Sequence, residues 1–170
     1  MHSLKAIDLI LANLQRAVAT RSLDSLEQLS IASVSASMAF SNAGLGAEHA
    51  LAHSLGGHFD MRHGVVHPIL LTSVMRFNMG INLPRMANLG RVILNRKSAS
   101  DQEAAVEGIA KLDEFFASFD VALRLSQLIP ESERHHLEPI SKMAVLDACN
   151  LTNPRPATWE EFLKICEEVW

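Results

Sequence analysis

The sequence predicts an all-α protein, a bundle of roughly seven helices that forms a single domain over residues 1–170. Apolar residues recur at intervals of three and four along most of the chain, which places them on one face of a helix. No run of alternating β-branched residues bounded by turn signals is present. A chain of 170 residues has the size of one domain and buries roughly 70% of its unfolded surface.

Three helices are expected in the first part of the chain. Leu4, Ile7, Leu14 and Val18 share one face of a helix over residues 3–20. Asp24 and Glu27 have the spacing of a capping box that opens a second helix, which should end near residues 42–44. A third helix should carry Ala47 to Leu55 and end at Gly56–Gly57.

The remaining helices follow from the same signals. We expect them over residues 63–77, with Pro68 in the first turns, and over 83–94 after a restart at Leu83–Pro84. Another begins at Ser100, with an inner stripe of Val106, Ile109, Leu112, Phe115 and Phe116. The next follows Pro130 and runs through Ile140, Met143, Val145 and Leu146. A capping box of Thr158 and Glu161 opens the last, which should turn Phe162, Leu163, Ile165 and Val169 inward.

One uncharged segment has the length of a membrane span. Residues 28–47 contain no charge over twenty positions. Five serines and Asn42 are spread around this segment, and a lipid environment would penalise them. We therefore interpret it as a helix buried on nearly all sides inside protein, and expect no membrane partner.

Composition narrows the class of protein further. The net charge of −4 gives no sign of a surface for nucleic acid or anionic membranes. The two cysteines, Cys149 and Cys166, are too few for a disulfide framework and favour a reducing compartment. The first residues lack the basic start and cleavage site of a signal peptide. These features predict a cytoplasmic protein.

The segment HALAHSLGGHFDMRHGVVH, residues 49–67, holds five of the eight histidines. His49 and His53 are four apart, so on a helix both rings project from one face, and apolar residues separate them. His63 stands at the start of the next helix, where two chain segments can converge on one metal ion. The alternative is that His49 and His53 pack or cap carbonyl groups and that His63 is a simple N-cap.

The other candidates in this region are assigned structural roles. We expect His58 to lie solvated in a connecting loop and His67 to pack on its helix, with His135 and His136 solvated. Glu48 should point to a different helix face from His49, and nothing fixes Asp60 near the histidines. Zinc and iron sites take three or four protein ligands, so we expect the chain to hold only part of a site.

The run MAFSNAGLGAEHALAHSLGGHFDMRHGVVHPILL, residues 38–71, closely resembles the signature region of the iron-containing (group III) alcohol dehydrogenases. The tail CNLTNPRPATWEEFLKICEEVW, residues 149–170, resembles the end of those proteins. The resemblance implies the all-helical metal-binding C-terminal domain of the dehydroquinate synthase-like fold. In that family an N-terminal α/β domain binds NAD(P), and one divalent ion, Fe²⁺ or sometimes Zn²⁺, is held by an aspartate and three histidines.

Carried onto this chain, the resemblance makes His49 and His63 metal ligands and His53 a catalytic residue close to the metal and nicotinamide. Phe40 and Cys149 match positions that border the cofactor and substrate pocket. The implied reaction is hydride transfer from a small alcohol to NAD(P), with the ion acting as a Lewis acid. His53 would help the proton depart or orient the nicotinamide ring.

The chain also departs from the family. No aspartate has a histidine four positions later, and there is no glycine-rich dinucleotide loop. HSLKAIDLI, residues 2–10, resembles the middle of a family helix, so we expect the nucleotide-binding domain to be absent. This chain alone should then be inactive, with weak metal binding or none and no NAD(P) binding.

Two further functions stay open. One is a stand-alone helical protein that kept the fold for binding or assembly, and the weaker one is a small metallohydrolase. If the chain is half of a dehydrogenase, its partner is the missing N-terminal half, or else the chain self-associates. The surface involved should be apolar, around Phe40, Leu45 and Leu55.

Overall fold

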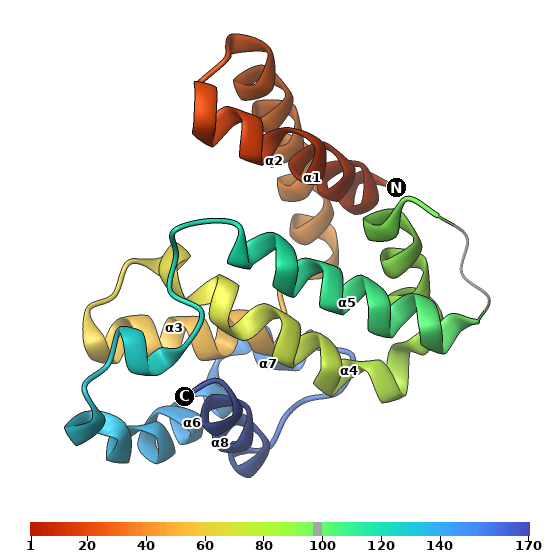
Figure 1. Cartoon of the computed structure of the whole chain (residues 1–170). Helices are drawn as coiled ribbons and strands as arrows, with labels where there is room; N and C mark the ends of the chain where they lie inside the picture. The colour runs from red at the N-terminus through yellow and green to blue at the C-terminus, as the bar shows by residue number, and fades with distance from the viewer. Residues whose placement is uncertain (97–99) are drawn as a thin grey trace. The chain divides into compact units, whose positions relative to one another are not determined.

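The computed structural model describes residues 1–96 and 100–170, and these residues are helical without any strand (Figure 1). The all-α prediction is therefore confirmed. The α-helices of the described residues are α1 (His2–Thr20), α2 (Leu23–Ala43), α3 (Ala47–Phe59), α4 (His63–Leu94), α5 (Asp101–Ala117), α6 (Leu137–Leu146), α7 (Ala148–Leu151) and α8 (Trp159–Glu168). Two 3-10 segments, η1 (Leu125–Gln127) and η2 (Glu131–His136), precede α6.

The described chain divides into two compact units. The first unit comprises Met1–Ala43 and Leu83–Lys111, and the second comprises Gly44–Asn82 and Leu112–Trp170. Their boundary in α4 coincides with Asn82, whose φ of −128° and ψ of 31° are not helical. The expected restart at Leu83 matches this break, whereas the single-domain assignment stays a prediction.

In the first unit, α4 and α5 cross with their backbones almost in contact. A Cβ atom added to Gly90 would lie 1.9 Å from the Ala104 carbonyl oxygen, and one added to Gly108 would lie 2.3 Å from the Gly90 Cα. Ala104 is fully buried at this crossing. Arg91 pairs with Asp101 at 2.6 Å and fastens the start of α5 to the end of α4. The small side chains are therefore what permits the close approach.

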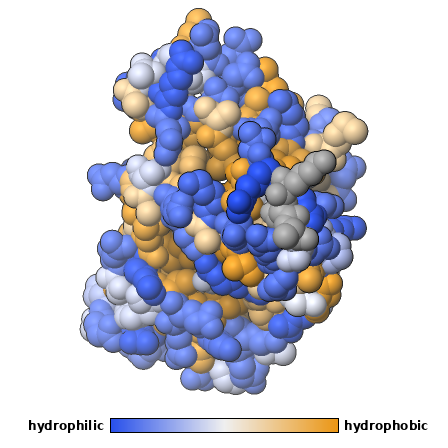
Figure 2. All heavy atoms as spheres, turned by 45° about the vertical axis from the view of Figure 1, so that its right-hand side comes forward, coloured by the Kyte–Doolittle hydropathy of each residue, from blue (hydrophilic) through white to orange (hydrophobic). Residues whose placement is uncertain are grey.

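The expectation that residues 28–47 form a buried helix is wrong. Ser25 and Ala32 of α2 are buried, but Val34, Met38 and Phe40 are exposed, with 45% of Phe40 accessible. Figure 2 shows hydrophobic residues reaching the molecular surface. Serine hydroxyls of α2 bond back to its own carbonyls, as Ser37 does to Ser33 at 3.0 Å, so the absence of charge did not require burial.

The start of α2 also differs from the prediction. The predicted capping pair is also wrong, because the Ser22 hydroxyl accepts from the Ser25 N–H at 3.4 Å and Asp24 lies within the first turn. None of the helices in the described residues is both long and apolar enough to cross a membrane.

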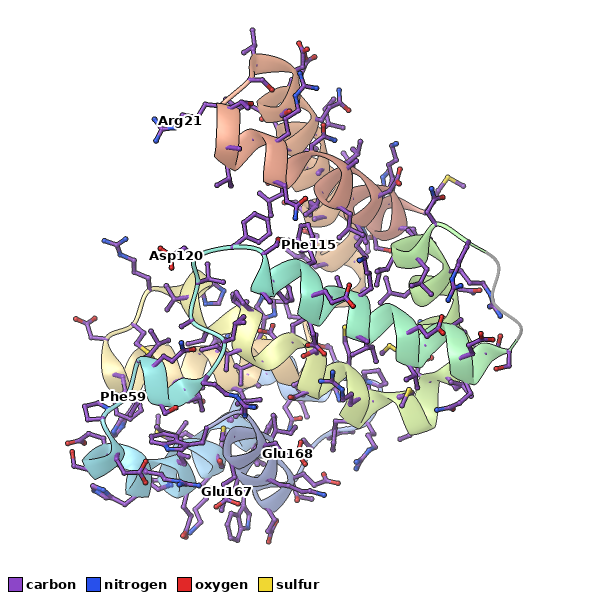
Figure 3. The ribbon with its side chains drawn as sticks, in the orientation of Figure 1. Arg21, Phe59, Phe115, Asp120, Glu167 and Glu168 are labelled. Atoms are coloured by element: carbon purple, nitrogen blue, oxygen red, sulfur yellow. The ribbon has the colours of Figure 1, made fainter. Side chains whose placement is uncertain are left out.

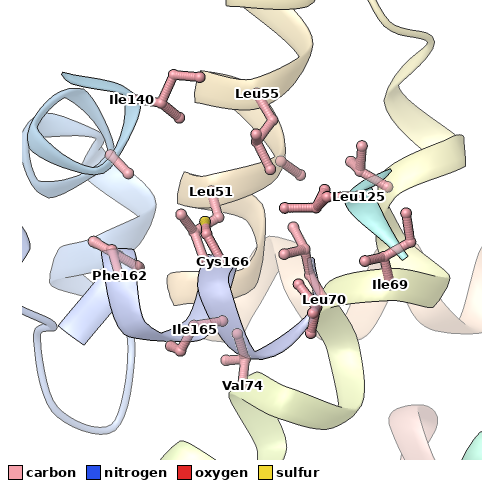
Figure 4. Close-up of a cluster of buried hydrophobic side chains, with 14 of the residues drawn as sticks. Leu51, Leu55, Ile69, Leu70, Val74, Leu125, Ile140, Phe162, Ile165 and Cys166 are labelled. Carbon is pink, nitrogen blue, oxygen red and sulfur yellow. The ribbon is translucent and has the colours of Figure 1, made fainter. Parts of the chain in front are cut away.

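The core of the second unit forms where α3, the first half of α4, α6 and α8 meet (Figure 4). Leu51, Leu55, Leu70, Ile140 and Phe162 are all essentially inaccessible to solvent. The predicted Thr158–Glu161 capping box is confirmed: the Thr158 N–H donates to Glu161 Oε2 at 2.9 Å, and the Glu161 N–H to Thr158 Oγ1 at 3.3 Å. This box aims the apolar face of α8 into the core.

The prediction that Gly56–Gly57 ends the third helix is wrong. Helix α3 continues to Phe59 and ends at Asp60, which takes the left-handed conformation with φ of 52°. Among the described glycines, Gly44 has a positive φ and Gly56 and Gly57 do not. A glycine ends a helix when it turns left-handed, and these two remain helical. His58 therefore lies on α3 and not in a loop.

Smaller departures concern which side chains face inward. Val106 is 47% exposed, while Ala105 and Ile109 of the same helix are buried. Met143 and Leu146 of α6 are also exposed, whereas Ile140 of the same helix is buried. Leu55 is fully buried and so cannot belong to the expected apolar surface patch.

Candidate metal centre

The first turn of α3 is held in place by a side chain from far along the chain. The N-cap position is Gly46, which offers no side chain, and the Ala47 N–H donates instead to Asn153 Oδ1 at 3.1 Å. Asn78 Nδ2 donates to the same oxygen at 3.0 Å, and Asn153 Nδ2 donates to Asn78 Oδ1 at 2.8 Å. Asn153 thereby joins α3 to α4 at the end from which the site histidines follow.

Four histidines gather where α3 and α4 face each other. The ring centroids of His49 and His63 lie 5.5 Å apart, and those of His53 and His63 lie 5.3 Å apart. The His67 ring lies 4.8 Å from His49 and 4.4 Å from His63. The structure therefore brings together the three histidines that the sequence selected, and it adds His67. Their roles in binding and catalysis stay predictions.

Glu48 lies inside this histidine cluster, contrary to the expectation that it points elsewhere. Its Oε2 lies 2.9 Å from His49 Nδ1, and its Oε1 accepts a hydrogen bond from His67 Nδ1. The residue is buried, with 7% of its surface exposed. The Glu48 side chain is long enough to reach α4, where it contacts His67. His67, expected to serve helix packing, thus belongs to the polar cluster.

The electrostatics of the cluster favour an ionised Glu48 carboxylate and a neutral His63 imidazole. Burial alone would raise the pKa of Glu48, but the hydrogen bonds with His49 and His67 bring this pKa below its usual value. The pKa of His63 is lowered by desolvation and by the neighbouring His67, His49 and His53. Neutral imidazole is the form that binds metals, so this donor set fits a divalent transition-metal ion.

A second group of ionisable side chains lies beside the first. His53 Nδ1 pairs with Asp147 Oδ2 at 2.8 Å, and Asp147 Oδ1 accepts from the Cys149 N–H at 2.7 Å as the N-cap of α7. One ligand atom from each of His53, Asp147 and Cys149 lies within 4.8 Å of the others. The sequence analysis missed Asp147, although an aspartate before a short helix is a recognisable cap.

The protonation states of this second group follow from its contacts. Burial would raise the pKa of Asp147, but the Cys149 N–H and His53 lower it overall. Burial, together with the hydrogen bond and negative charge of Asp147, raises the pKa of the Cys149 thiol to about 11. At neutral pH the group therefore holds a carboxylate against His53 and an uncharged thiol.

The other sequence candidates lie apart from the cluster or in the other unit. Phe40 belongs to α2 of the first unit. The His58 ring lies against His136 in a tilted arrangement, with ring centroids 4.5 Å apart, and beside Phe59, which is labelled in Figure 3. His135 Nδ1 contacts the Ser132 carbonyl at 2.7 Å, and His135 is exposed.

A cavity of about 540 Å³ in the second unit lies among Pro68, Thr72, Phe116, Leu123 and Glu168, the last labelled in Figure 3. Its charged groups are already engaged. Arg76 pairs with Asp113, and Arg124 Nη1 donates to the Glu168 carbonyl at 2.9 Å. The cavity therefore offers less available chemistry than the histidine cluster.

Comparison with known proteins decides the family. The model of the Fe-containing alcohol dehydrogenase family, C-terminal region, matches residues 1–170. The chain belongs to this family. It is similar to 1,3-propanediol dehydrogenase of Klebsiella pneumoniae, with 34% identity over 171 residues that cover 99% of the chain and 43% of the relative. It is also similar to 1-propanol dehydrogenase PduQ of Salmonella typhimurium, with 36% identity over 143 residues, or 81% and 39% of the two chains.

A solved structure supports the fold of this chain. The crystal structure of a 1,3-propanediol oxidoreductase superposes with a TM-score of 0.93 at 32% identity, covering 99% of this chain and 44% of that one. The resemblance noted from residues 38–71 and 149–170 is thus confirmed, and so is the C-terminal helical fold. The chain spans less than half the length of the relatives it matches.

Proposed function

We propose that this chain forms the metal-site half of an iron-type NAD(P)-dependent alcohol dehydrogenase that interconverts small alcohols and their aldehydes or ketones. The convergence of His49, His53 and His63 carries the proposal, together with the family match over residues 1–170. The names of the two relatives, which act on 1,3-propanediol and 1-propanol, favour short primary alcohols as the substrate class.

In this proposal His49 and His63 hold the divalent ion, Fe²⁺ or Zn²⁺. When bound, such an ion polarises the alcohol oxygen as a Lewis acid. The His63 imidazole is available in its neutral form at neutral pH because its pKa is lowered by desolvation and by the neighbouring His67, His49 and His53. The two ligands come from different helices, and the buried core beneath α3 and α4 fixes their spacing.

His53 is the residue we assign to proton movement. Asp147 accepts from its Nδ1 at 2.8 Å, which holds the ring and directs the proton-accepting lone pair to Nε2. Its side chain is 41% exposed, so that nitrogen can exchange protons with substrate or water. The uncharged thiol of Cys149 provides a neutral wall, which suits its proposed place beside the nicotinamide.

The nucleotide site and the remaining metal ligands would come from the part of the longer relatives that this chain does not match. No aspartate of this chain has a histidine four positions later, and no glycine-rich dinucleotide motif is present in the 170 residues. We therefore propose that these residues alone do not oxidise alcohols or bind NAD(P). A reducing cytoplasm fits the two free cysteines, Cys149 and Cys166.

The partner surface we propose lies on α2. Val34, Met38 and Phe40 expose apolar side chains there, which favours contact with the N-terminal half or with a second copy of the chain. Light scattering over a range of concentrations distinguishes these states, since mass that grows with concentration indicates self-association. A monomer at all concentrations would contradict self-association and leave the N-terminal half as the partner.

The catalytic proposal is tested by restoring the missing half. The chain is fused behind the N-terminal half of the Klebsiella pneumoniae relative, loaded with Fe²⁺ and assayed for NAD(P)H formation from 1,3-propanediol and 1-propanol. We expect activity that His53→Ala reduces by about 10²–10⁴-fold, the usual contribution of a positioned acid or base. His135→Ala is the matched control and should leave the rate unchanged. A folded, metal-loaded fusion without activity would favour the stand-alone binding or assembly protein.

A further inference from the structure

The buried carboxylate of Glu48 contacts the rings of two histidines at once. Its oxygens accept from Nδ1 of His49 at 2.9 Å and from Nδ1 of His67. An ionised carboxylate is an acceptor only, so both Nδ1 atoms must carry their hydrogens. The lone pair of each neutral ring then lies on Nε2.

This arrangement matches the supporting shell of protein metal sites. Metal-binding histidines commonly donate the hydrogen of their second ring nitrogen to a carboxylate, which fixes the ring and raises its basicity. Here one carboxylate provides this support to two rings on different helices, α3 and α4. Burying a carboxylate costs free energy, and only 7% of Glu48 is exposed. A histidine pair that served only to pack the helices would not require this buried carboxylate.

A third nitrogen completes the group. His63 begins α4, and one ring nitrogen from each of His49, His63 and His67 lies within 4.8 Å of the other two. Metal–nitrogen bonds of about 2.0–2.1 Å in a tetrahedral site hold their nitrogens roughly 3.3 Å apart. Side-chain rotations are enough to cover that difference, while the buried Leu51 and Leu70 keep the two helices in place.

We propose that His67 is a third metal ligand, so that this chain by itself binds one divalent transition-metal ion through His49, His63 and His67. Glu48 is the positioning residue for this site. The inference rests on the proposed function for the roles of His49 and His63, and it adds His67 and Glu48. With two histidine ligands the chain was expected to bind metal weakly or not at all, whereas with three it should bind one ion per chain.

The test uses the chain of residues 1–170 after dialysis against a chelator. Zn²⁺ is titrated by calorimetry, and Co²⁺ by the absorption of its d–d bands, which reports the coordination geometry. We expect one ion per chain. His67→Ala should weaken binding by roughly tenfold or more, and Glu48→Gln by about 10–100-fold. His135→Ala, which removes an exposed histidine outside the cluster, should bind as the unaltered chain does.

The role of Glu48 has its own signature. The two rings contact different oxygens of Glu48, so a glutamine in the same position places its oxygen acceptor against one ring and its NH₂ donor against the other. The other ring must then switch its hydrogen to Nε2. Nitrogen-15 NMR of the histidine rings in the metal-free chain should therefore show both His49 and His67 protonated at Nδ1, and only one of them in Glu48→Gln.

Several outcomes would overturn the inference. If His67→Ala binds as tightly as the unaltered chain while His49→Ala and His63→Ala do not bind, His67 is not a ligand and the proposed function stands. A folded chain without a stoichiometric ion also overturns it, whereas the dehydrogenase fusion tests the proposed function separately. If His67→Ala fails to fold, the unaltered chain decides, because the His67 Nε2 resonance must shift when Zn²⁺ is added.

Discussion

Replacing Asn153 with alanine should destabilise the protein more than any exposed polar substitution, because four hydrogen bonds meet on this side chain. Its Oδ1 accepts from the Ala47 N–H at 3.1 Å and from Asn78 Nδ2 at 3.0 Å. Its Nδ2 donates to Asn78 Oδ1 at 2.8 Å and to the Arg155 carbonyl at 2.6 Å. Asn153, Ala47 and Asn78 are all buried, so water does not readily replace these bonds.

The magnitude follows from the bonds that are lost. At about 1 kcal/mol net for each hydrogen bond, with buried partners left unsatisfied, Asn153→Ala should cost about 3–4 kcal/mol of unfolding free energy. For a chain of this size each kcal/mol lowers Tm by about 2–4 °C, so we expect a fall of roughly 6–16 °C. Asn42→Ala is the matched control, because Asn42 is exposed and donates to one carbonyl of its own helix, at 2.7 Å. It should change stability by no more than about 0.5 kcal/mol.

Urea unfolding followed by circular dichroism measures the difference, with an unchanged m value as the check that both variants unfold in the same way. A loss below about 1 kcal/mol for Asn153→Ala would refute the reasoning, since the four bonds would then have little net value. Metal titration adds a second measurement. Because Asn153 holds the first turn of α3, its loss should also weaken binding at His49, two residues into the helix.

Three other expectations follow from named contacts. Gly90→Ala should destabilise the chain by about 1–3 kcal/mol in urea unfolding, because its Cβ would lie 1.9 Å from the Ala104 carbonyl oxygen. Gly80 has open space around it, so the control Gly80→Ala should instead stabilise the chain by up to about 1 kcal/mol. The Thr158 N–H and Arg155 lower the pKa of Glu161. This carboxylate therefore stabilises the fold above its unfolded pKa of 4.5, and the stabilisation is lost as the pH falls through the lower folded pKa. The Tm of Glu161→Gln should accordingly depend less steeply on pH below 4.5 than the Tm of the unaltered chain. Asp147→Asn should speed alkylation of Cys149 near pH 8, because removing the carboxylate charge lowers the thiol pKa from about 11.

Local signals in the sequence were enough to predict much of the fold. The Thr158–Glu161 box and the restart at Leu83 depend on neighbouring residues, and both were predicted correctly. The end of α3 was not, because a glycine pair ends a helix only if one glycine turns left-handed, and here Asp60 does so. The exposure of α2 was missed because an uncharged helix can satisfy its polar groups by itself.

In the candidate site too, residues linked by local spacing were predicted, and residues linked by distant contacts were not. The i,i+4 spacing and the position of His63 indicated three histidines that the structure brings together. Glu48 and His67 are 19 residues apart, and His53 and Asp147 are 94 apart, so no local pattern links either pair. Only the packing of α3 against α4 and α7 makes these carboxylates partners of the histidines.

These distant contacts share a physical role at the site, since each polar side chain fixes one part of it. Asn153 holds the beginning of α3, Glu48 sets the rings of His49 and His67, and Asp147 orients His53. Glu48, His49 and His53 stand on α3, whose inner face is closed by buried residues such as Leu51. Because hydrogen bonds within the protein position these side chains, metal binding should require little folding of the chain. The measured affinity would then depend chiefly on the ligands themselves, which is why the single change His67→Ala is informative.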